Sequence, residues 1–283
     1  MENTLPAVNG LPELRPMYMS DLPTVVKIID YDDDDDAEAA EADFHNNGME
    51  DHFVLELDGK VIGVTGYRTV PATDRTCWLS WTYLANTHRG KGLGKFMTQE
   101  LIEKVKQIQG RKIFVKVSDY DDPKEGKIYA AALAMYQSLG FIEEVRSVDF
   151  YDEGEDQMIL GLNLSDDASF ADDEQKVAEE KPIIRFNGMH EIAETEGAYT
   201  FRWEVKNKKK LFGKRNFTVE DLQIGLKAVK NDGGRKIFLT FPSNLPLIHT
   251  PLQAAGFKYV GQLTDYYEKG VHEFHFSHDL RNI

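Results

Sequence analysis

Residues 88–95 read His-Arg-Gly-Lys-Gly-Leu-Gly-Lys, and this glycine-rich stretch determines how the rest of the chain is interpreted. It follows an apolar run that predicts a strand over 78–84 and precedes a run that predicts a helix over 96–107. Three glycines within five residues let the backbone turn sharply and approach a ligand closely. The free N–H groups at the start of the helix carry partial positive charge, and three basic side chains add formal charge. The stretch therefore predicts a site for an anion of pyrophosphate size.

The spacing of the glycines excludes two common nucleotide-binding loops. A Walker P-loop needs four residues between its first glycine and a Gly-Lys-Ser/Thr end, and a dinucleotide fingerprint needs Gly-x-Gly-x-x-Gly. Residues 89–94 instead read Arg-x-x-Gly-x-Gly. That pattern resembles the acetyl-CoA loop of the GCN5-related N-acetyltransferase (GNAT) superfamily.

A second part of the chain strengthens this resemblance. Residues 112–117 predict a fifth strand, and the alanine-rich run 130–139 predicts a helix that stops at Gly140. The GNAT family has a helix of this kind that ends in Tyr-x-x-x-Gly-Phe, an ending that Tyr136 and Gly140-Phe141 reproduce. The resemblance covers roughly residues 13–164. It implies an α/β (α+β) fold, with a mixed, mostly antiparallel sheet flanked by helices.

The same resemblance implies a site and a reaction. Acetyl-CoA would be the co-substrate, with backbone groups at Tyr83 and Leu84 holding its pantetheine arm and Tyr136 donating a proton to the departing thiolate. The loop residues that would hold the pyrophosphate are Arg89, Gly90, Lys91, Gly92, Leu93, Gly94 and Lys95. The implied enzyme is an N-acetyltransferase that acts on a primary amine of a small molecule or peptide by direct attack in a ternary complex. The alternative is a CoA-binding sensor or interaction module of the same fold without transferase activity.

Two departures from the family pattern leave the general base unassigned. The family's asparagine seven residues before the tyrosine is Tyr129 here, and the acid often found on the fourth strand is replaced by Ser80 and Trp81. The candidates elsewhere are Glu50, Asp51, His52 and Asp119, and a chain of water molecules is an equal alternative.

Three histidines near the end of the chain resemble a metal cluster at first sight, namely His272, His275 and His278. Their spacing of three residues fits neither one face of a strand nor a strong helix context. We therefore interpret them as surface residues, and the sequence predicts no metal site.

The composition limits the function classes. The formal net charge of the 283 residues is -15, which argues against a general binder of nucleic acids or anionic membranes. No apolar run approaches the roughly 20 residues that span a bilayer, and no signal peptide is visible. One cysteine, Cys77, excludes a disulfide framework within a monomer. We expect a cytoplasmic monomer or homodimer. The acidic run 32–36 is interpreted as a solvated loop between two helices, with an acidic rim for a cationic acceptor as the alternative.

An internal repeat predicts a second unit. Gly-Arg-Lys-Ile-Phe at 110–114 recurs at 234–238, and Gly140 and Gly256 are followed by tails that align at a constant offset of 116 residues. We expect a GNAT domain over 1–164, an acidic linker over 165–181 and a degenerate GNAT-like domain over 182–283. The second copy has lost the glycine loop, since 206–215 keeps one glycine, and Leu252 stands at the position of Tyr136. We expect it to cover an edge of the first domain, to shape the acceptor cleft or to make a dimer contact, and its basic loop could bind a phosphate or an acidic partner.

Overall fold

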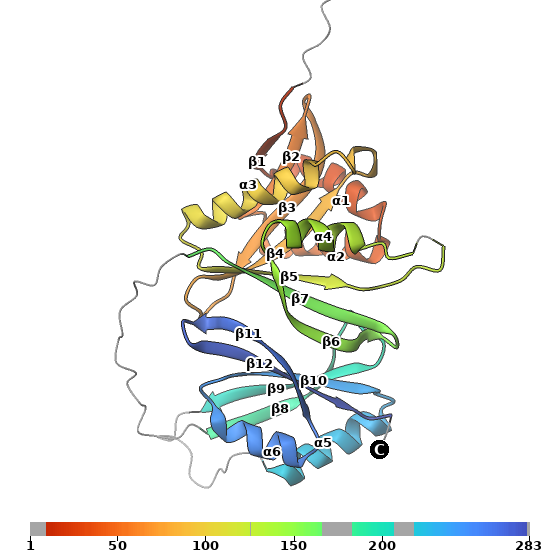
Figure 1. The fold of residues 1–283 in the computed structure, drawn as a ribbon. Coiled ribbons are helices and arrows are strands. Elements are labelled where there is room, and N and C mark those ends of the chain that lie inside the picture. Colours follow the sequence, from red (N-terminus) through yellow and green to blue (C-terminus); the bar gives the residue numbers. More distant parts are fainter. Residues whose placement is uncertain (1–9, 125, 166–182, 207–217, 282–283) are drawn as a thin grey trace, which may run out of the picture.

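The computed structural model describes residues 10–124, 126–165, 183–206 and 218–281, which form two β-sheets with helices packed against them (Figure 1). The predicted linker 165–181 and the predicted basic loop 206–215 lie almost wholly outside these described residues.

The first sheet has seven strands in the order β1-β2-β3-β4-β5-β7-β6. Their bounds are β1 (Glu13–Pro16), β2 (His52–Leu57), β3 (Lys60–Thr69), β4 (Thr76–Leu84), β5 (Lys112–Ser118), β6 (Ile142–Asp152) and β7 (Glu155–Asn163). All neighbouring strands are antiparallel except β4 and β5, which are parallel. This pairing joins residues 76–78 to 112–114 and ends there, so the two strands separate beyond Trp78.

Helices cover both faces of this sheet, and the alternation of side chains along the strands decides which core each face belongs to. The helices are α1 (Leu22–Asp30), α2 (Asp34–Asn47), α3 (Leu93–Gln107) and α4 (Ala130–Ser138). Val54 of β2 packs in one core with α1 and α2, whereas the adjacent Leu55 packs in another with α3 and α4. The predicted mixed α/β fold, with a mostly antiparallel sheet flanked by helices, is therefore confirmed.

Two element boundaries differ from the sequence-based expectation. Helix α3 begins at Leu93 and so includes part of the glycine-rich stretch, because Gly92 adopts a left-handed conformation with φ 78° that starts the helix. The acidic run is not all loop, since α2 begins at Asp34. Acidic side chains in a first turn interact favourably with the helix dipole, and Asp33 caps the helix by accepting a hydrogen bond from the Asp36 N–H at 2.9 Å.

The second sheet has five strands in the order β11-β12-β10-β9-β8. Their bounds are β8 (Ile183–Glu191), β9 (Ala198–Lys206), β10 (Lys236–Pro242), β11 (Lys258–Glu268) and β12 (Val271–Asp279). Again one neighbouring pair, β9 and β10, is parallel, and the others are antiparallel. Strands β8-β9-β10-β12-β11 thus repeat the order and directions of β3-β4-β5-β7-β6.

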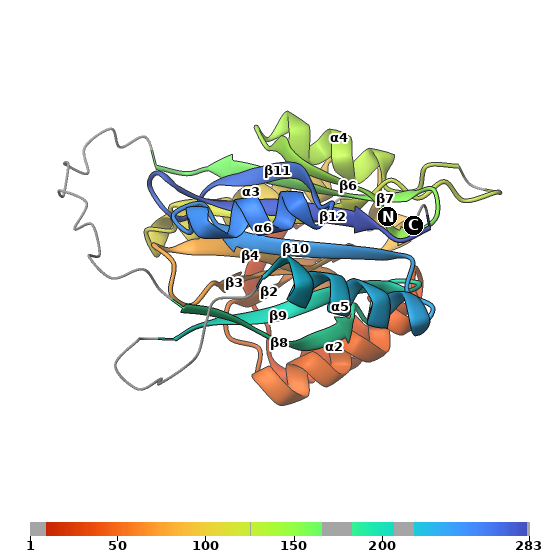
Figure 2. The ribbon, with the colours of Figure 1, turned by 90° about the horizontal axis from the view of Figure 1, so that it is seen from below.

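Two helices close the far side of the second sheet. In Figure 2, α5 (Val219–Asn231) and α6 (His249–Ala254) lie across the sheet face that is turned away from the first sheet. Leu222 of α5 and Leu252 of α6 are fully buried in a core with Ile237 of β10. The opposite face of β10 turns toward the first sheet, where the ring of Phe238 packs at a tilt of 52° against Phe150, with ring centroids 4.9 Å apart. The second unit therefore covers part of a sheet face of the first unit.

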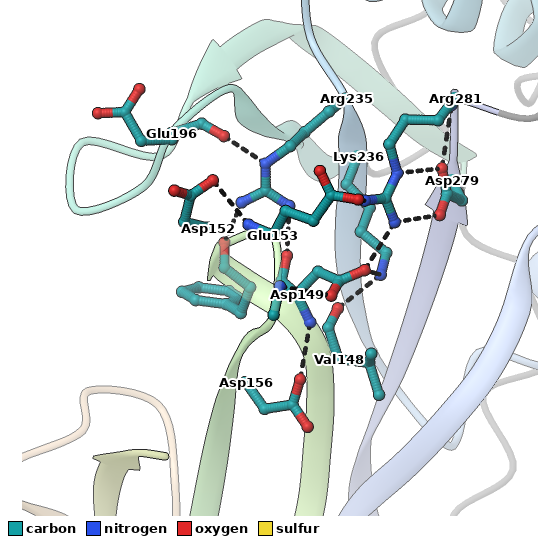
Figure 3. Close-up of polar contacts among 12 residues, drawn as sticks. Val148, Asp149, Asp152, Glu153, Asp156, Glu196, Arg235, Lys236, Asp279 and Arg281 are labelled. Atoms are coloured by element: carbon teal, nitrogen blue, oxygen red, sulfur yellow. Dashed lines mark hydrogen bonds and ion pairs between the residues drawn. The ribbon is translucent and has the colours of Figure 1, made fainter. Parts of the chain in front are cut away.

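Polar contacts of the second unit reach the bulged part of β6 (Figure 3). Arg235 donates to the carbonyl oxygens of Asp149 and Phe150 at 2.5 and 3.0 Å. Lys236 donates to the Val148 carbonyl at 2.6 Å and pairs with the Asp149 carboxylate at 3.2 Å. Asp149 itself has a positive φ of 50°, which turns its carbonyl and carboxylate toward these two cations.

The first unit makes equivalent contacts in return. Arg111 donates to the carbonyl oxygen of Asp265 at 2.5 Å, and Lys112 donates to that of Thr264. Asp265 has a φ of 55°, close to that of Asp149. Lys112 is buried and is neutralised by Glu144 at 2.7 Å. The recurring Arg-Lys pair therefore explains part of the sequence repeat: each copy holds the bulged strand of the other unit.

Candidate functional site

The first feature of the site is a bulge in β4, next to the point where β4 and β5 separate. The register with β3 shifts between the pairs Val64–Tyr83 and Gly66–Ser80. Trp81 takes up the extra residue with a φ of 41°, in the left-handed region that non-glycine residues rarely adopt. The parallel pairing of β4 with β5 ends at Trp78, so the backbone of the following residues of β4 borders an opening in the sheet instead of a paired strand. Tyr83 and Leu84 are the last two residues of β4 beside this opening.

The glycine loop lies at the same end of β4 and leads into α3. Gly90 and Gly92 have φ values of 72° and 78°, and a Cβ at either position would meet no atom within 4 Å. Backbone conformation, not space, therefore requires glycine there. The first helical bond runs from the Phe96 N–H to the Gly92 carbonyl at 3.0 Å. The N–H groups of residues 93–95 precede that bond and have no acceptor within the helix.

Two of the three basic side chains of the loop, those of Arg89 and Lys91, point back onto the protein. Arg89 donates from Nε to the Leu84 carbonyl at 2.9 Å and forms an ion pair with Asp32. Lys91 donates from Nζ to the Thr87 carbonyl at 2.8 Å. The side chain of Lys95 is exposed at the start of α3. Arg89 thus fastens the loop to the segment after α1, and backbone amides are the main groups left to hold an anion.

Tyr136 lies in α4 with its ring buried, 5% exposed, and packed edge-on against Phe141 at 5.5 Å. Burial raises the pKa of its phenol to about 12, and a hydrogen bond with the Thr82 side chain acts in the opposite direction. The phenol is therefore protonated at neutral pH and can act as a proton donor. Because Thr82 directly follows the bulged Trp81, the structure places Tyr136 beside the opening between β4 and β5.

His52, one of the candidate bases, has a structural role. It is buried, with Nδ1 3.0 Å from the Glu50 carbonyl and Nε2 3.0 Å from Ser80 Oγ. Burial lowers the pKa of the imidazole, which favours the neutral ring. Both ring nitrogens are therefore occupied, and Ser80 is turned toward His52.

The remaining candidates are engaged or exposed. Asp51 accepts the hydroxyl hydrogen of Tyr67 at 2.9 Å. Asp119 accepts from the Asp156 N–H at 2.7 Å and pairs with Arg146 at 3.3 Å. Glu50 is exposed. None of these three carboxylates is shown in contact with Tyr136 or with the bulge in the described part of the chain.

A carboxylate that the sequence did not single out lies at the opening instead. The hydroxyl of Tyr83 donates to Asp36 Oδ2 across the gap between β4 and α2. Burial raises the pKa of Asp36, with smaller contributions from Asp33 and Asp35, while the hydrogen bond from Tyr83 opposes the shift. Tyr129, which caps α4, also faces this group: burial raises the pKa of its phenol, and the charge of Asp36 raises it further. The acidic run was the sequence signal, but five adjacent acids could not be told apart.

The three histidines are not surface residues, contrary to the expectation from the sequence. They lie on β12, where His278 is buried against Phe257 and His275 lies 3.3 Å from Glu273. His272 Nδ1 accepts from the Asp265 N–H at 2.9 Å. The reason is that β12 lies between β11 and β10 within the sheet, and Phe276 of this strand packs in one core with α5 and α6.

No helix in the described part of the chain combines the length and the apolar character needed to span a bilayer.

Comparison with known proteins gives a family match and several similar folds. Residues 11–141 match the model of the acetyltransferase (GNAT) family. Similar solved structures include a GNAT-family protein from Desulfovibrio desulfuricans, with 22% identity and a TM-score of 0.48 over 55% of this chain and 100% of that one. The ribosomal-protein-S18-alanine N-acetyltransferase of Escherichia coli has 22% identity and a TM-score of 0.45 over 57% of this chain and 99% of its own. A Salmonella typhimurium structure that contains acetyl-CoA has 18% identity and a TM-score of 0.46, covering 56% and 98%.

No curated protein gives a significant match to this sequence. The family match spans the bulged strand, the glycine loop, α3 and α4, which are the elements that build the opening described above. Residues 11–141 are therefore a domain of the acetyltransferase (GNAT) family.

Proposed function

We propose that the protein is an acetyl-CoA-dependent N-acetyltransferase that transfers an acetyl group to a primary amine of a small molecule or peptide. The observation that carries the proposal is the combination of three features around one opening. These are the divergence of β4 and β5 after Trp78, the free amides at the start of α3 and the buried, protonated Tyr136. A nucleotide-linked thioester needs a phosphate cradle, a polarised carbonyl and a proton for its sulfur, and each of these features supplies one of them.

The proposed roles follow from the geometry. Amides of residues 92–95 bind the pyrophosphate of acetyl-CoA at the positive end of the α3 dipole. The backbone at Tyr83 and Leu84 holds the pantetheine arm in the opening that β5 leaves free. Tyr136 donates its proton to the departing sulfur. The amine attacks the thioester directly while both substrates are bound.

The quick test is release of free thiol from acetyl-CoA in the presence of a panel of primary amines, followed with a thiol reagent. We expect amine-dependent release by the intact chain. A chain that binds CoA but releases no thiol with any amine would contradict the transferase proposal.

The second candidate function is a CoA-binding sensor or interaction module without transfer. The occupied side chains on β4 favour it, because Ser80 is bonded to His52 and the Trp81 Nε1–H donates to Asp43 at 2.6 Å. The strand thus presents no acid of its own to an amine. Thiol release decides between the two candidates.

We also propose that residues 182–283 are a degenerate copy of the family domain, joined to the domain over 1–164 by the segment 165–181. The repeated strand order and the repeated parallel pair support this. Leu252 at the position of Tyr136 is fully buried and carries no proton to donate, so the copy supplies a packing surface and no second site. The cytoplasmic location and the monomeric or homodimeric state stay predictions.

A further inference from the structure

The contact between Tyr83 and Asp36 places a carboxylate next to the expected thioester. Tyr83 is the penultimate residue of β4, and its backbone is expected to hold the arm that carries the thioester. Its hydroxyl donates to Oδ2 of Asp36, in the first turn of α2. In the described part of the chain, no other hydrogen bond to the Asp36 carboxylate is seen, so its second oxygen remains available to a substrate.

We propose that Asp36 binds the ammonium group of the acceptor and takes its proton, so that the acceptor is a primary alkylamine that is cationic in solution. This inference rests on the proposed acetyl transfer. It assigns the general base that the sequence left open.

Three nearby acids already have partners, whereas Asp34 and Asp35 are exposed to solvent and the Asp36 carboxylate is bonded, within the described residues, only to a tyrosine hydroxyl. Asp32 forms an ion pair with Arg89, Asp33 caps α2, and Asp43 pairs with Arg68. Among the described residues, no lysine, arginine or histidine lies within ion-pair distance of Asp36. A carboxylate that is half-buried and lacks a cation is unfavourable. A substrate ammonium would supply the missing positive charge.

The groups around Asp36 also suit a cation. The hydroxyl of Tyr83 on β4 is bonded to this carboxylate, and the charge of Asp36 also acts on Tyr129 at the start of α4. Asp32, Asp33 and Glu155 all raise the pKa of Tyr129, so the potential at this point is negative. Such a site favours alkylammonium acceptors over neutral or anionic ones.

The reaction balances with Asp36 as the base. Asp36 takes one proton from the ammonium group, and the neutral nitrogen then attacks the thioester carbonyl. A C–N bond forms and the C–S bond breaks, while the sulfur takes a proton from Tyr136. The nitrogen gives up a second proton, which restores Tyr136, and Asp36 releases the first one to solvent. One ammonium and one acyl thioester thus give one amide, one thiol and one proton.

The environment of Asp36 fits this role. Burial raises the pKa of its carboxyl, and Asp33 and Asp35 raise it further. A base whose pKa lies closer to the working pH accepts a proton more readily. The titratable groups that face Asp36 are these two acids on its own helix, Tyr83 on β4 and Tyr129 at α4.

The test compares Asp36→Asn with Asp34→Asn, which removes an exposed acid from the same helical turn. Asparagine keeps an acceptor oxygen for the Tyr83 hydroxyl. We expect Asp36→Asn to lower kcat for an alkylamine at pH 7 by about 100-fold or more, with acetyl-CoA affinity unchanged. Asp34→Asn should stay within about twofold of the wild type. Should the asparagine variant not fold, Asp36→Glu keeps the carboxylate and is expected to retain measurable transfer.

A pH series separates a base from a structural role. Without Asp36, the amine must lose its proton in solution, so kcat/KM of Asp36→Asn should rise about tenfold per pH unit up to the amine pKa of about 10. Transfer by Asp36→Asn within threefold of the wild type at pH 7 would overturn the inference, as would a flat pH profile of the impaired variant. If the wild type itself binds CoA and transfers to no amine, the proposed function fails instead.

Discussion

At the scale of single residues, the proposed site combines glycines that shape the loop with side chains that would carry protons. Gly90 and Gly92 adopt positive φ, as a glycine-rich turn requires, and Tyr136 lies against the bulged strand. The two glycines and the tyrosine each belong to a short sequence motif, and such a motif can be recognised without knowing how the chain folds. Asp36 could not be predicted, because its contact with Tyr83 depends on how α2 packs over β4, which no local pattern encodes.

Removal of the Tyr136 hydroxyl tests the assigned proton donor. Tyr136→Phe should lower kcat by about 100-fold, because the thiolate would leave without a proton, while the affinity for acetyl-CoA stays the same. Tyr67→Phe is the matched control, since Tyr67 is equally buried and its hydroxyl is bonded to Asp51. Steady-state kinetics gives kcat for the two variants, and calorimetry gives their affinity for acetyl-CoA. Equal losses of activity in the two variants would count against a chemical role for Tyr136.

At the scale of elements, the strand, the glycine loop and the following helix were predictable, but the first residue of the helix was not. Helix α3 begins three residues earlier than expected because the glycine loop itself forms the first turn. Helix α2 takes in Asp34, Asp35 and Asp36, which a charge-based interpretation assigns to a loop. The cap explains the difference, since the Asp33 side chain accepts from the Asp36 N–H.

Loss of this cap should destabilise α2 and displace the proposed base with it. Asp33→Ala is expected to lower the free energy of unfolding by about 1 kcal/mol and to reduce transfer to amines. Thr218→Ala removes a comparable cap from α5 in the second unit. It should have a similar effect on stability and leave transfer unchanged. Urea unfolding measures the stability of both variants, and thiol release measures their transfer activity. If both variants lose transfer activity, the loss follows from lower stability and not from displacement of Asp36.

At the scale of the whole molecule, the repeat predicted a second unit but not how it is attached. The offset of 116 residues relates Asp149 to Asp265, and the structure shows that the carbonyl of each accepts from the arginine of the opposite unit's Arg-Lys pair. Reciprocity of this kind depends on the mutual packing of two sheets, so an alignment of the two halves cannot reveal it. Three roles for the unit were left as alternatives, and its packing against the face of β5, β6 and β7 supports a role in covering the first unit.

Breaking the buried ion pair at this junction should destabilise the molecule strongly. Lys112→Met leaves Glu144 buried, 6% exposed in its side chain, without its cation. We expect a loss of about 3–5 kcal/mol in the free energy of unfolding. Lys116→Met removes a half-exposed lysine that lies 3.7 Å from Glu194, and it should cost less than about 1 kcal/mol. Chemical unfolding of the two variants at the same pH compares their stabilities. If Lys112→Met costs no more than Lys116→Met, the buried ion pair contributes little to stability.

The junction should also weaken in acid. The Gly154 N–H, Arg281 and Lys236 lower the pKa of Asp149, and Arg281 lowers that of Asp279 to about 2. Carboxyls with a depressed folded-state pKa contribute their full stability above the unfolded value of about 3.9 and lose it as the pH falls through the folded value. Thermal unfolding should therefore show a falling melting temperature from pH 4 downward. Arg281→Gln should flatten that decline, and an unchanged decline would place its cause elsewhere.

The most direct test of the account is a calorimetric titration of acetyl-CoA into the wild type, Gly92→Ala and Gly59→Ala. Both glycines have positive φ, 78° and 72°, and open space around them, so alanine strains the backbone about equally at either position. Only Gly92 starts the helix whose amides are proposed to hold the pyrophosphate. We predict that the wild type and Gly59→Ala bind acetyl-CoA alike and that Gly92→Ala binds at least about tenfold more weakly. Equal binding by all three proteins, or no binding by the wild type at millimolar acetyl-CoA, would contradict the account.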